Sequence, residues 1–372
     1  MAPSYRGQHQ QVSSGVRVHR FRYAPAGLET LTHDQTVPDR LRDHPLYAAL
    51  LPGYVVAGSI AAARLARSGG FDVIHAFWPL PHGIFGLAAR GVARVPLVST
   101  FFGAELRWVT RQLPYLTPLL KAIIRRSDAV TAISNHTAGE VRSLVPAANV
   151  VRIPFGAAIE APETATNGGA HASASEEYRL LFVGRLVERK GMELLLRAIA
   201  HLRRECPVSL TVVGDGPLRP QLERLASGMR IEESVRFTGY VSVEELGRLY
   251  SMADAFVLPA VQDSKGDVEG LGVVLIEALT HGIPVIASRS GGIPDIVRDE
   301  ETGLLVDPGD VESLSAAIRR LRADPDLARR LVDSGRQHVA KTFSWDVIVN
   351  DLQALYEQLA LQPGTVSSRH GA

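Results

Sequence analysis

The stretch that decides the fold is Glu269-Gly-Leu-Gly-Val-Val-Leu-Ile-Glu277-Ala-Leu-Thr-His-Gly-Ile-Pro284-Val-Ile-Ala287. Its first part, Leu271–His281, is mostly apolar and predicts a buried helix, whereas Pro284–Ala287 is a short β-branched run that predicts a strand. A helix that leads within a few residues into a buried strand is typical of α/β folds with parallel sheets. The rest of the chain is therefore expected to alternate in the same way.

The second half of the chain alternates as expected. Its predicted strands are Leu180–Val183, Ser209–Val213, Val235–Thr238, Ala255–Leu258, Pro284–Ala287 and Leu304–Val306. Its predicted helices are Met192–Glu205, Leu218–Ala226, Val243–Ala253, Leu271–His281, Val311–Arg322, Leu327–Lys341 and Trp345–Ala360. This series predicts one Rossmann-like domain with a parallel sheet.

The first half shows a weaker version of the same alternation. Its predicted strands are Val16–Arg22, Asp72–His75, Pro96–Thr100, Ala129–Ile133 and Val150–Ile153, with helices over His82–Arg94 and Asn135–Leu144. The residues that follow, Ala157–Glu177, are rich in Ala, Ser, Gly, Thr and Glu and read as a linker. A chain of 372 residues usually forms two domains. We therefore predict a domain over 1–157, a linker over 158–177, a second domain over 178–342 and a helix over 343–361.

Composition excludes several classes of protein. The net charge is +1, so no general attraction to nucleic acid is expected. The single cysteine, Cys206, excludes an intrachain disulfide and a multi-cysteine metal site, and it is assigned a packing role. The N-terminus has no apolar core of a signal peptide. The most apolar run, Leu46–Ala63, contains Pro52, Gly53 and Gly58, which favours a buried or interfacial helix over a membrane span. We expect a cytoplasmic protein.

Two cations follow the first strand of the second half, in Gly184-Arg185-Leu-Val-Glu-Arg-Lys190-Gly191. Gly184 permits a sharp turn at the carboxyl end of the strand, where open α/β sheets bind ligands. Arg185 and Lys190 are suited to phosphate oxygens. The alternative is an ordinary solvated basic loop.

One carboxylate, Glu269, precedes the predicted helix that begins at Gly270 or Leu271, and a second, Glu277, lies within it. Glu269 at the mouth of the helix can accept hydrogen bonds from sugar hydroxyls, and Gly270 and Gly272 allow a phosphate to approach the free amides. Glu277 is placed roughly 12 Å further along a helix that rises about 1.5 Å per residue. A carboxylate in that apolar helix needs a ligand or a structural donor. A helix cap and an internally bonded core Glu explain the pair equally well.

Two glycine-rich turns give weaker indications. Ser290-Gly291-Gly292 precedes a short helix, and its amides are candidates to meet an anion. Gly214-Asp-Gly-Pro217 is a similar turn but lacks the glycine spacing of a dinucleotide-binding fingerprint.

The motifs in the second half of the chain resemble those of glycosyltransferase family 4. The resemblance rests on VGRLVERKG (183–191), VVGDGP (212–217), FTGYV (237–241), EGLGVVLIEALTHGIPVIAS (269–288), GGIPDIV (291–297) and TGLLVDPGD (302–310). Weaker likeness extends through VHRFRYAPAGLETL (18–31) and DVIHAFWPLPHG (72–83). The resemblance implies the α/β GT-B fold, in which two Rossmann-like domains enclose a cleft and the C-terminal helix crosses back to the first domain.

The resemblance also implies a retaining transfer of a sugar from a nucleoside-diphosphate sugar to a glycan, lipid-linked or small-molecule acceptor. Glu269, Arg185 and Lys190 are then the catalytic residues. The implied donor site consists of Gly184, Arg185, Lys190, Val241, Glu269, Gly270, Leu271, Gly272 and Glu277, with Val241 near the base and Glu277 at the ribose. No cofactor or metal is expected, because arginine, lysine and a helix dipole can replace the divalent cation.

Two departures from the family pattern concern the first half. Many relatives have a His that bonds the donor sugar where this chain has Phe102, in Ser99-Thr-Phe-Phe-Gly-Ala-Glu105. Because Phe cannot hydrogen-bond, His75, His82 and Glu105 are candidates on the acceptor side. The family also begins with a strand and a glycine-rich loop that this chain is expected to lack, so residues 1–15 read as the loop before the first retained strand, Val16–Arg22.

Other interpretations stay open at this stage. The main alternative is a catalytically impaired relative or partner protein that binds a nucleotide sugar; a GT-B phosphorylase or epimerase is a further one. Helix-forming residues Leu119–Arg126 place Lys121, Arg125 and Arg126 beside apolar side chains. This pattern suits a peripheral contact with the inner membrane face or an ordinary amphipathic helix.

Overall fold

The chain forms two compact units. The computed structural model describes residues 1–4, 10–32, 37, 40–41, 44–157 and 177–361. Unit 1 comprises the described residues of 1–131, 141–151 and 353–361, and unit 2 those of 132–140 and 152–352. The last helix, α13 (Trp345–Ala360), belongs to unit 2 up to Leu352 and to unit 1 from Gln353. Apart from Glu177, the predicted linker 158–177 lies outside the described residues.

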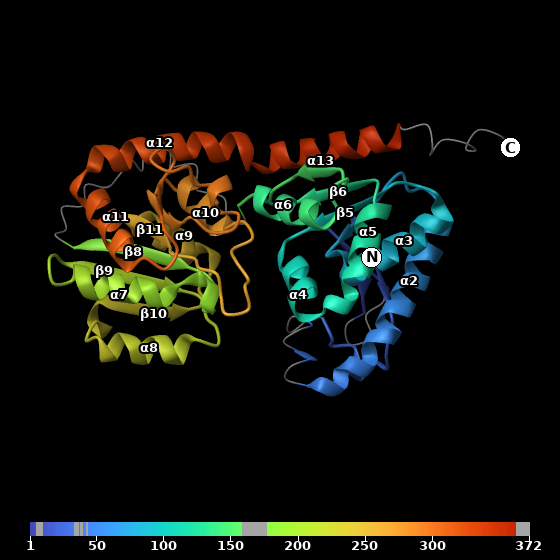
Figure 1. Cartoon of the computed structure of the whole chain (residues 1–372), viewed down its shortest axis with the longest axis horizontal. Helices are drawn as coiled ribbons and strands as arrows, with labels where there is room; N and C mark the ends of the chain where they lie inside the picture. The colour runs from blue at the N-terminus through green and yellow to red at the C-terminus, as the bar shows by residue number, and fades with distance from the viewer. Residues whose placement is uncertain (5–9, 33–36, 38–39, 42–43, 158–176, 362–372) are drawn as a thin grey trace. The chain divides into compact units, whose positions relative to one another are not determined.

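Unit 2 is built on a six-stranded parallel sheet (Figure 1). Its strands are β8 (Tyr178–Val183), β9 (Val208–Val213), β10 (Val235–Gly239), β11 (Ala255–Leu258), β12 (Val285–Ser288) and β13 (Leu304–Val306). Their spatial order is β10-β9-β8-β11-β12-β13. The chain therefore moves outward from β8 to β10, returns to the other side of β8 at β11, and creates a topological switch point between β8 and β11.

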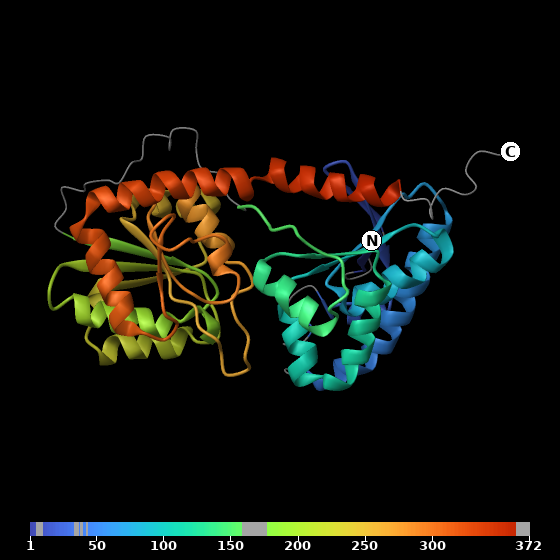
Figure 2. The same cartoon turned by 45° about the horizontal axis from the view of Figure 1, so that its top comes forward.

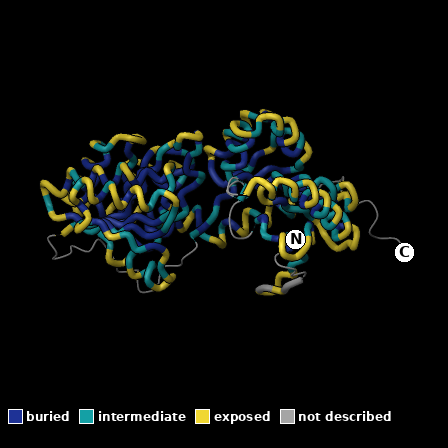
Figure 3. The backbone as a smooth tube through the Cα atoms, turned by 90° about the horizontal axis from the view of Figure 1, so that it is seen from below, coloured by how far each residue is buried: buried dark blue, intermediate teal, exposed yellow. Residues whose placement is uncertain are grey.

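Helices cover both faces of this sheet. They are α7 (Met192–Leu202), α8 (Arg219–Gly228), α9 (Val243–Met252), α10 (Val273–Thr280), α11 (Val311–Ala323) and α12 (Pro325–Thr342), with short 3-10 turns η5 (Glu188–Lys190), η6 (Glu232–Ser234) and η7 (Ile293–Asp295). In Figure 2, α7 and α8 lie on one face and α10 and α12 on the other. Every residue of β11 and β12 is buried, and Figure 3 shows buried backbone, in dark blue, running through the middle of this unit. Burial on both faces explains why their sequences are apolar up to Ser288, the last residue of β12.

Unit 1 contains a four-stranded sheet in the order β4-β5-β6-β7. The strands are β4 (Ile74–Phe77), β5 (Leu97–Phe101), β6 (Ala129–Ala132) and β7 (Val150–Arg152). The helices are α2 (Leu51–Arg67), α3 (Pro79–Ala93), α4 (Ala104–Gln112), α5 (Thr117–Arg126) and α6 (Asn135–Leu144), with turns η1 (Ala26–Leu28), η2 (Pro45–Leu50) and η3 (Pro114–Leu116). Of α6, only the part from Val141 belongs to unit 1. Because β4 and β5 run parallel and pair Phe77 with Thr100, their carboxyl ends lie together.

A separate small sheet corrects the predicted start of the chain. Residues 1–15 were expected to form a loop, but β1 (Ala2–Pro3) pairs parallel to β3 (Val16–Phe21) and β2 (Gln10–Ser13) pairs antiparallel to it. The turn Ser14–Gly15 closes a tight hairpin, since Ser13 is paired with Val16. The expectation that Val16–Arg22 begins the main parallel sheet is therefore wrong within the described part of the chain.

Of the two apolar runs of unit 1 that raised a question of membrane contact, the first packs on one side only and leaves Val56 and Ile60 exposed, whereas the second packs within the unit. Within the described residues one helical stretch, Pro45–Arg67, is long and apolar enough to cross a membrane by length and composition. Its helix α2 packs along α3 and buries Tyr54, Gly58 and Ala66. Likewise, α5 buries Leu120, Ile123 and Ile124. The apolar face of α5 is therefore used within unit 1, as in an ordinary amphipathic helix.

Candidate functional site: the carboxyl edge of the unit 2 sheet

The turns after β8 and β9 lie against each other at the carboxyl edge of the sheet. The amide of Gly184 donates to the carbonyl of Val213 over 2.9 Å, and the amide of Leu186 donates to the carbonyl of Asp215 over 2.9 Å. These bonds fix the 184–191 turn at the position where open α/β sheets bind their ligands. The predicted cations Arg185 and Lys190 both belong to this turn.

Lys190 forms a buried ion pair with Glu269. Its Nζ lies 2.7 Å from Oε2 of Glu269, and the two residues are 7% and 8% exposed. The lysine stem folds back along the turn, because a Cβ built on Gly184 would lie 3.5 Å from its Cε. Arg185 lies in the same turn and is exposed. The structure thus joins the two strongest sequence motifs, which are 79 positions apart (269 − 190), at the β8/β11 switch point.

The segment that carries Glu269 rests on a second glycine-rich turn. The amide of Gly292 donates to the carbonyl of Glu269 over 2.9 Å. A Cβ on Gly291 would lie 2.0 Å from the same carbonyl oxygen, so only glycine permits this approach. The Gly292 amide is therefore paired within the protein, which favours a structural turn over an anion site for this amide. The turn at 290–292 positions Glu269.

The predicted start of the following helix is wrong. Helix α10 begins at Val273, because Gly272 has a φ of +90° that no helical residue adopts. Glu269 and Gly270 therefore belong to an extended turn, and the estimate of a continuous helical rise from Glu269 to Glu277 does not apply. Leu271 is 2% exposed, so its side chain belongs to the core.

Glu277 has a structural donor in α9. The hydroxyl of Tyr250 donates to Oε2 of Glu277 over 2.9 Å, and both residues are buried. Burial, reinforced by the nearby carboxylate, raises the pKa of Tyr250, which therefore stays a donor throughout the ordinary pH range. The ring of His281 stacks on Tyr250 at 4.8 Å. Sequence analysis missed Tyr250, since it does not follow a motif of its own.

Val241 lies at the same edge of the sheet but further from the ion pair. It falls in the turn between β10 and α9, and β9 separates β10 from β8. The candidate donor-site residues thus follow strands β8, β10 and β11 at one edge.

The acceptor-side candidates lie in unit 1 and form hydrogen bonds within it. His75 Nδ1 lies 2.5 Å from the hydroxyl of Tyr356, and its Nε2 lies 2.5 Å from Oγ1 of Thr100. Burial lowers the pKa of His75 to about 4. His82 is also bonded through both ring nitrogens, to the Phe77 carbonyl at 2.7 Å and the Tyr54 hydroxyl at 3.2 Å, and burial lowers its pKa. These bonds favour structural roles for both histidines.

Glu105 is the most deeply buried candidate in unit 1. It is 3% exposed, and its Oε1 accepts a hydrogen bond from the amide of Phe102 over 2.6 Å. Burial raises its pKa to about 7, although that hydrogen bond opposes the shift. Its second oxygen, Oε2, is buried without a hydrogen-bond partner. Glu105 thereby fixes the turn that carries Phe102, whose ring stacks on Trp78. Trp78 was not predicted as a site residue, because the strand was expected to end at His75, whereas β4 ends at Phe77, directly before Trp78.

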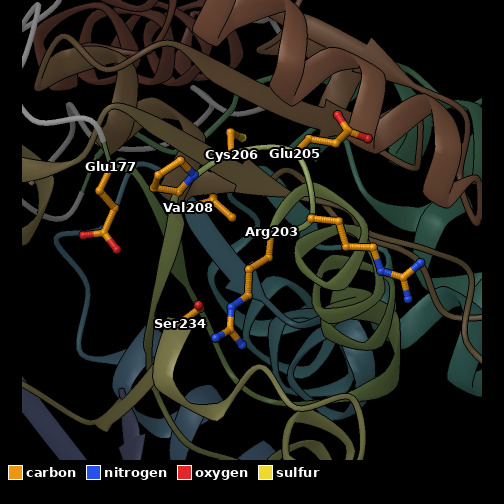
Figure 4. A pocket seen from close by; sticks show the side chains of 8 residues that line it. Glu177, Arg203, Glu205, Cys206, Val208 and Ser234 are labelled. Carbon is orange, nitrogen blue, oxygen red and sulfur yellow. The ribbon is translucent and has the colours of Figure 1, made fainter.

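A hollow at the opposite edge of the unit 2 sheet is separate from these residues. It is lined by Glu177, Arg203, Arg204, Glu205, Cys206, Pro207, Val208 and Ser234 and has a volume of about 470 Å³ (Figure 4). Glu177 and Pro207 precede β8 and β9, so the hollow lies at the amino ends of these strands. Cys206 bonds to the Leu202 carbonyl, at 3.6 Å from its Sγ. Among the described residues, no group of three or more His, Cys, Asp or Glu side chains is arranged to hold a metal ion.

Comparison with known proteins identifies the chain. The family model for glycosyl transferases group 1 matches residues 165–338, and the model for glycosyltransferase family 4 matches residues 9–160. The structure is similar to that of sucrose-phosphate synthase from Thermosynechococcus elongatus, with a TM-score of 0.73 and 27% identity over 94% of this chain and 84% of that one. Two α/β units of this kind define a glycosyltransferase with the GT-B fold.

Curated relatives give the family. The GDP-mannose-dependent alpha-(1-6)-phosphatidylinositol monomannoside mannosyltransferase of Mycolicibacterium smegmatis is 34% identical over 89% of this chain and 88% of its own length. The N-acetyl-alpha-D-glucosaminyl L-malate synthase of Bacillus anthracis is 27% identical over 82% and 79%. The chain belongs to glycosyltransferase family 4, and it is an enzyme of that class.

Proposed function

We propose that the enzyme transfers a sugar from a nucleoside-diphosphate sugar to a hydroxyl of its acceptor with retention of anomeric configuration. The observation that carries the proposal is the buried Lys190–Glu269 pair at the switch point of the unit 2 sheet. GDP-mannose is the first donor to test, because the 34% identical relative is named as GDP-mannose-dependent. The acceptor is a glycan, a lipid-linked sugar or a small molecule.

The pair suits a leaving diphosphate. A lysine ammonium has three N–H donors, so Lys190 can hold Glu269 with one and phosphate oxygens with the others. Arg185, in the same turn, adds a second cation with bidentate geometry. As the bond from the anomeric carbon to the diphosphate breaks, these cations stabilise the charge that develops on the leaving oxygen. Glu269 accepts hydrogen bonds from the donor-sugar hydroxyls, and Glu277 from the ribose.

Retention requires the acceptor to approach from the face that the diphosphate leaves. The new bond joins the acceptor oxygen to the anomeric carbon, and the departing diphosphate takes up the hydroxyl proton. Positioning and charge stabilisation are then the main contributions of the protein. On this proposal the reaction needs no metal, so excess EDTA leaves turnover unchanged.

Donor hydrolysis is the direct test. The full chain is incubated with GDP-mannose, UDP-glucose and UDP-N-acetylglucosamine, with and without simple glycoside acceptors, and free nucleoside diphosphate is measured. Lys190→Ala and Glu269→Ala are expected to lower turnover about 100-fold. Lys341→Ala and Glu301→Ala, both exposed in the same unit, serve as matched controls.

The anomeric configuration of the product, measured by NMR coupling constants, tests retention separately. An inverted product would overturn retention without affecting the donor assignment. Turnover that survives both Lys190→Ala and Glu269→Ala would overturn the assigned site. We further propose that the enzyme works in the cytoplasm, with peripheral contact to the inner membrane face when its acceptor is lipid-linked; cell fractionation tests this placement.

A further inference from the structure

Three aromatic side chains meet at the carboxyl edge of the unit 1 sheet. Phe77 is the last residue of β4, Trp78 follows it, and Phe102 follows β5. Because β4 and β5 are adjacent and parallel, these residues share one edge. We call Phe77, Trp78 and Phe102 the aromatic platform.

The platform is partly open to solvent, and two of its three rings lie face to face. Trp78 and Phe102 stack with ring centroids 4.6 Å apart and planes inclined by 10°, and the ring of Phe77 lies 6.4 Å from that of Phe102 and is inclined to it by 53°. Phe77 is 42% exposed and Trp78 43% exposed. Large aromatic side chains are normally buried, so an exposed stack of them indicates a surface kept for binding.

The backbone of Trp78 supports this interpretation. Its φ of 58° and ψ of 80° place it in the left-handed region, where a bulky residue costs about 1–3 kcal/mol. Glycine would adopt this conformation without strain, yet the position carries the largest side chain. Strain of this kind is found where function requires a side chain in a particular place.

Hydrogen-bonded groups support Phe77 and Phe102 of the platform. Phe77 stacks on His75 with centroids 4.2 Å apart, and both ring nitrogens of His75 are bonded, to Tyr356 and Thr100. The amide of Phe102 is bonded to the buried Glu105. Since its supports are fixed, the platform is organised before any ligand arrives.

We propose that the aromatic platform stacks against a pyranose ring of the acceptor, so that the acceptor presents a carbohydrate at this site. The inference rests on the proposed function. Aromatic faces carry negative partial charge and attract the C–H groups that cover one face of a pyranose. They offer nothing to a phosphate or carboxylate. The cations assigned to the donor diphosphate belong to unit 2, whereas the platform belongs to unit 1 and is made of uncharged rings. Because Phe102 stands where many relatives have a His that bonds the donor sugar, the donor KM has to be measured beside the acceptor KM.

The first experiment measures binding directly. Saturation-transfer NMR with methyl α-D-mannopyranoside and methyl β-D-glucopyranoside, added to the full chain, is expected to saturate the ring protons of one sugar face. Trp78→Ala should remove this signal, and Trp78→Phe should restore most of it. Tyr115→Ala is the matched control, since Tyr115 is an aromatic residue of unit 1 that is 73% exposed.

The second experiment measures kinetics with the same glycosides as acceptors. Trp78→Ala and Phe102→Ala are expected to raise the acceptor KM about tenfold more than the donor KM. Two variants at different strands keep the test valid should one of them fail to fold, which thermal unfolding detects.

The outcomes separate the two proposals. Wild-type protein that turns over no donor contradicts the proposed function, while the NMR titration still decides the platform. Wild-type turnover with no ring saturation, or an acceptor KM that the variants do not change, overturns the platform. A larger rise in donor KM assigns the rings to the nucleobase, and binding only to phosphatidylinositol vesicles assigns them to a lipid; either result also overturns the proposal.

Discussion

Nζ of Lys190 lies 2.7 Å from Oε2 of Glu269, and each residue is less than one-tenth exposed. Removing two charges from water costs several kcal/mol per ion, so a buried pair is not retained for stability alone. Here one partner comes from the turn after β8 and the other from the turn before α10, at the switch point of the sheet. The pair thus joins the two turns that the proposed function assigns to the diphosphate and the donor sugar.

Breaking this pair on one side is expected to destabilise unit 2. Lys190→Met leaves the Glu269 carboxylate buried without its cation, and Glu269→Gln leaves the Lys190 ammonium without its anion. Each should lower the free energy of unfolding by about 3–5 kcal/mol, measured by urea unfolding. The double variant removes both charges and should recover most of the stability but no donor turnover. A double variant that recovers neither would show that the pair is needed for folding itself.

Most of the unit 2 fold could be predicted because its strands are buried on both faces. The predicted bounds Ala255–Leu258, Leu304–Val306 and Trp345–Ala360 are those of β11, β13 and α13. The α/β class and the family followed from the alternation and from motifs at the strand ends. Helix α10 was predicted two residues too long at its start, since its apolar pattern includes Leu271, which is buried outside the helix.

Unit 1 was predicted less well, for physical reasons. Gln10–Ser13 is polar and short, so its pairing in β2 depends on the Ser14–Gly15 turn and on β3. Helix α4 has no predicted counterpart, because Glu105 and Arg107 are buried in it and break the apolar pattern. Contacts such as His75 with Tyr356 and Trp78 with Phe102 join distant positions, which periodicity within a segment cannot reveal.

Gly191→Ala is expected to disrupt the candidate site. Gly191 has a φ of +67°, and a Cβ there would lie 1.8 Å from the Pro259 carbonyl oxygen, which is backbone and cannot rotate away. Strain and clash together should lower the free energy of unfolding by more than about 2 kcal/mol and reduce donor turnover. Gly228→Ala is the control, since nothing lies within 4 Å of its Cβ position and its φ is not in the left-handed region. Equal melting temperatures for the two variants would contradict this account.

His75 and Glu105 should give unit 1 opposing pH dependences. The folded pKa of His75 is lowered from 6.5 to about 4, so the unfolded chain binds the extra proton and stability rises with pH between about 4 and 6.5. The folded pKa of Glu105 is raised from 4.5 to about 7, so the native state binds the extra proton and stability falls as pH rises from about 4.5 to 7. Each effect amounts to about 3 kcal/mol, and the two largely cancel.

Single substitutions should separate these effects. His75→Gln removes the contribution to stability that rises with pH. The urea concentration at the midpoint of unfolding of this variant should therefore decrease as the pH is raised from 4.5 to 6.5, relative to wild type. Glu105→Gln removes the contribution to stability that falls with pH, so the midpoint of unfolding of this variant should increase as the pH is raised from 4.5 to 6.5. Tryptophan fluorescence reports on unit 1 through Trp78 and Trp108, with a contribution from Trp345 in unit 2. Slopes equal to the wild-type slope in both variants would contradict the assigned burial of these groups.

Tyr250→Phe tests whether Glu277 only forms a structural hydrogen bond in the core or also binds the ribose of the donor. The change removes the hydroxyl that donates to Oε2 of Glu277 over 2.9 Å in a buried site. Loss of that donor should lower the free energy of unfolding by about 1–3 kcal/mol. Tyr115→Phe, at a residue that is 73% exposed, should change nothing. If Glu277 also holds the ribose, the reoriented carboxylate should raise the donor KM about tenfold, and Glu277→Gln should do the same. A destabilised variant with an unchanged donor KM would restrict Glu277 to the core and remove it from the donor site.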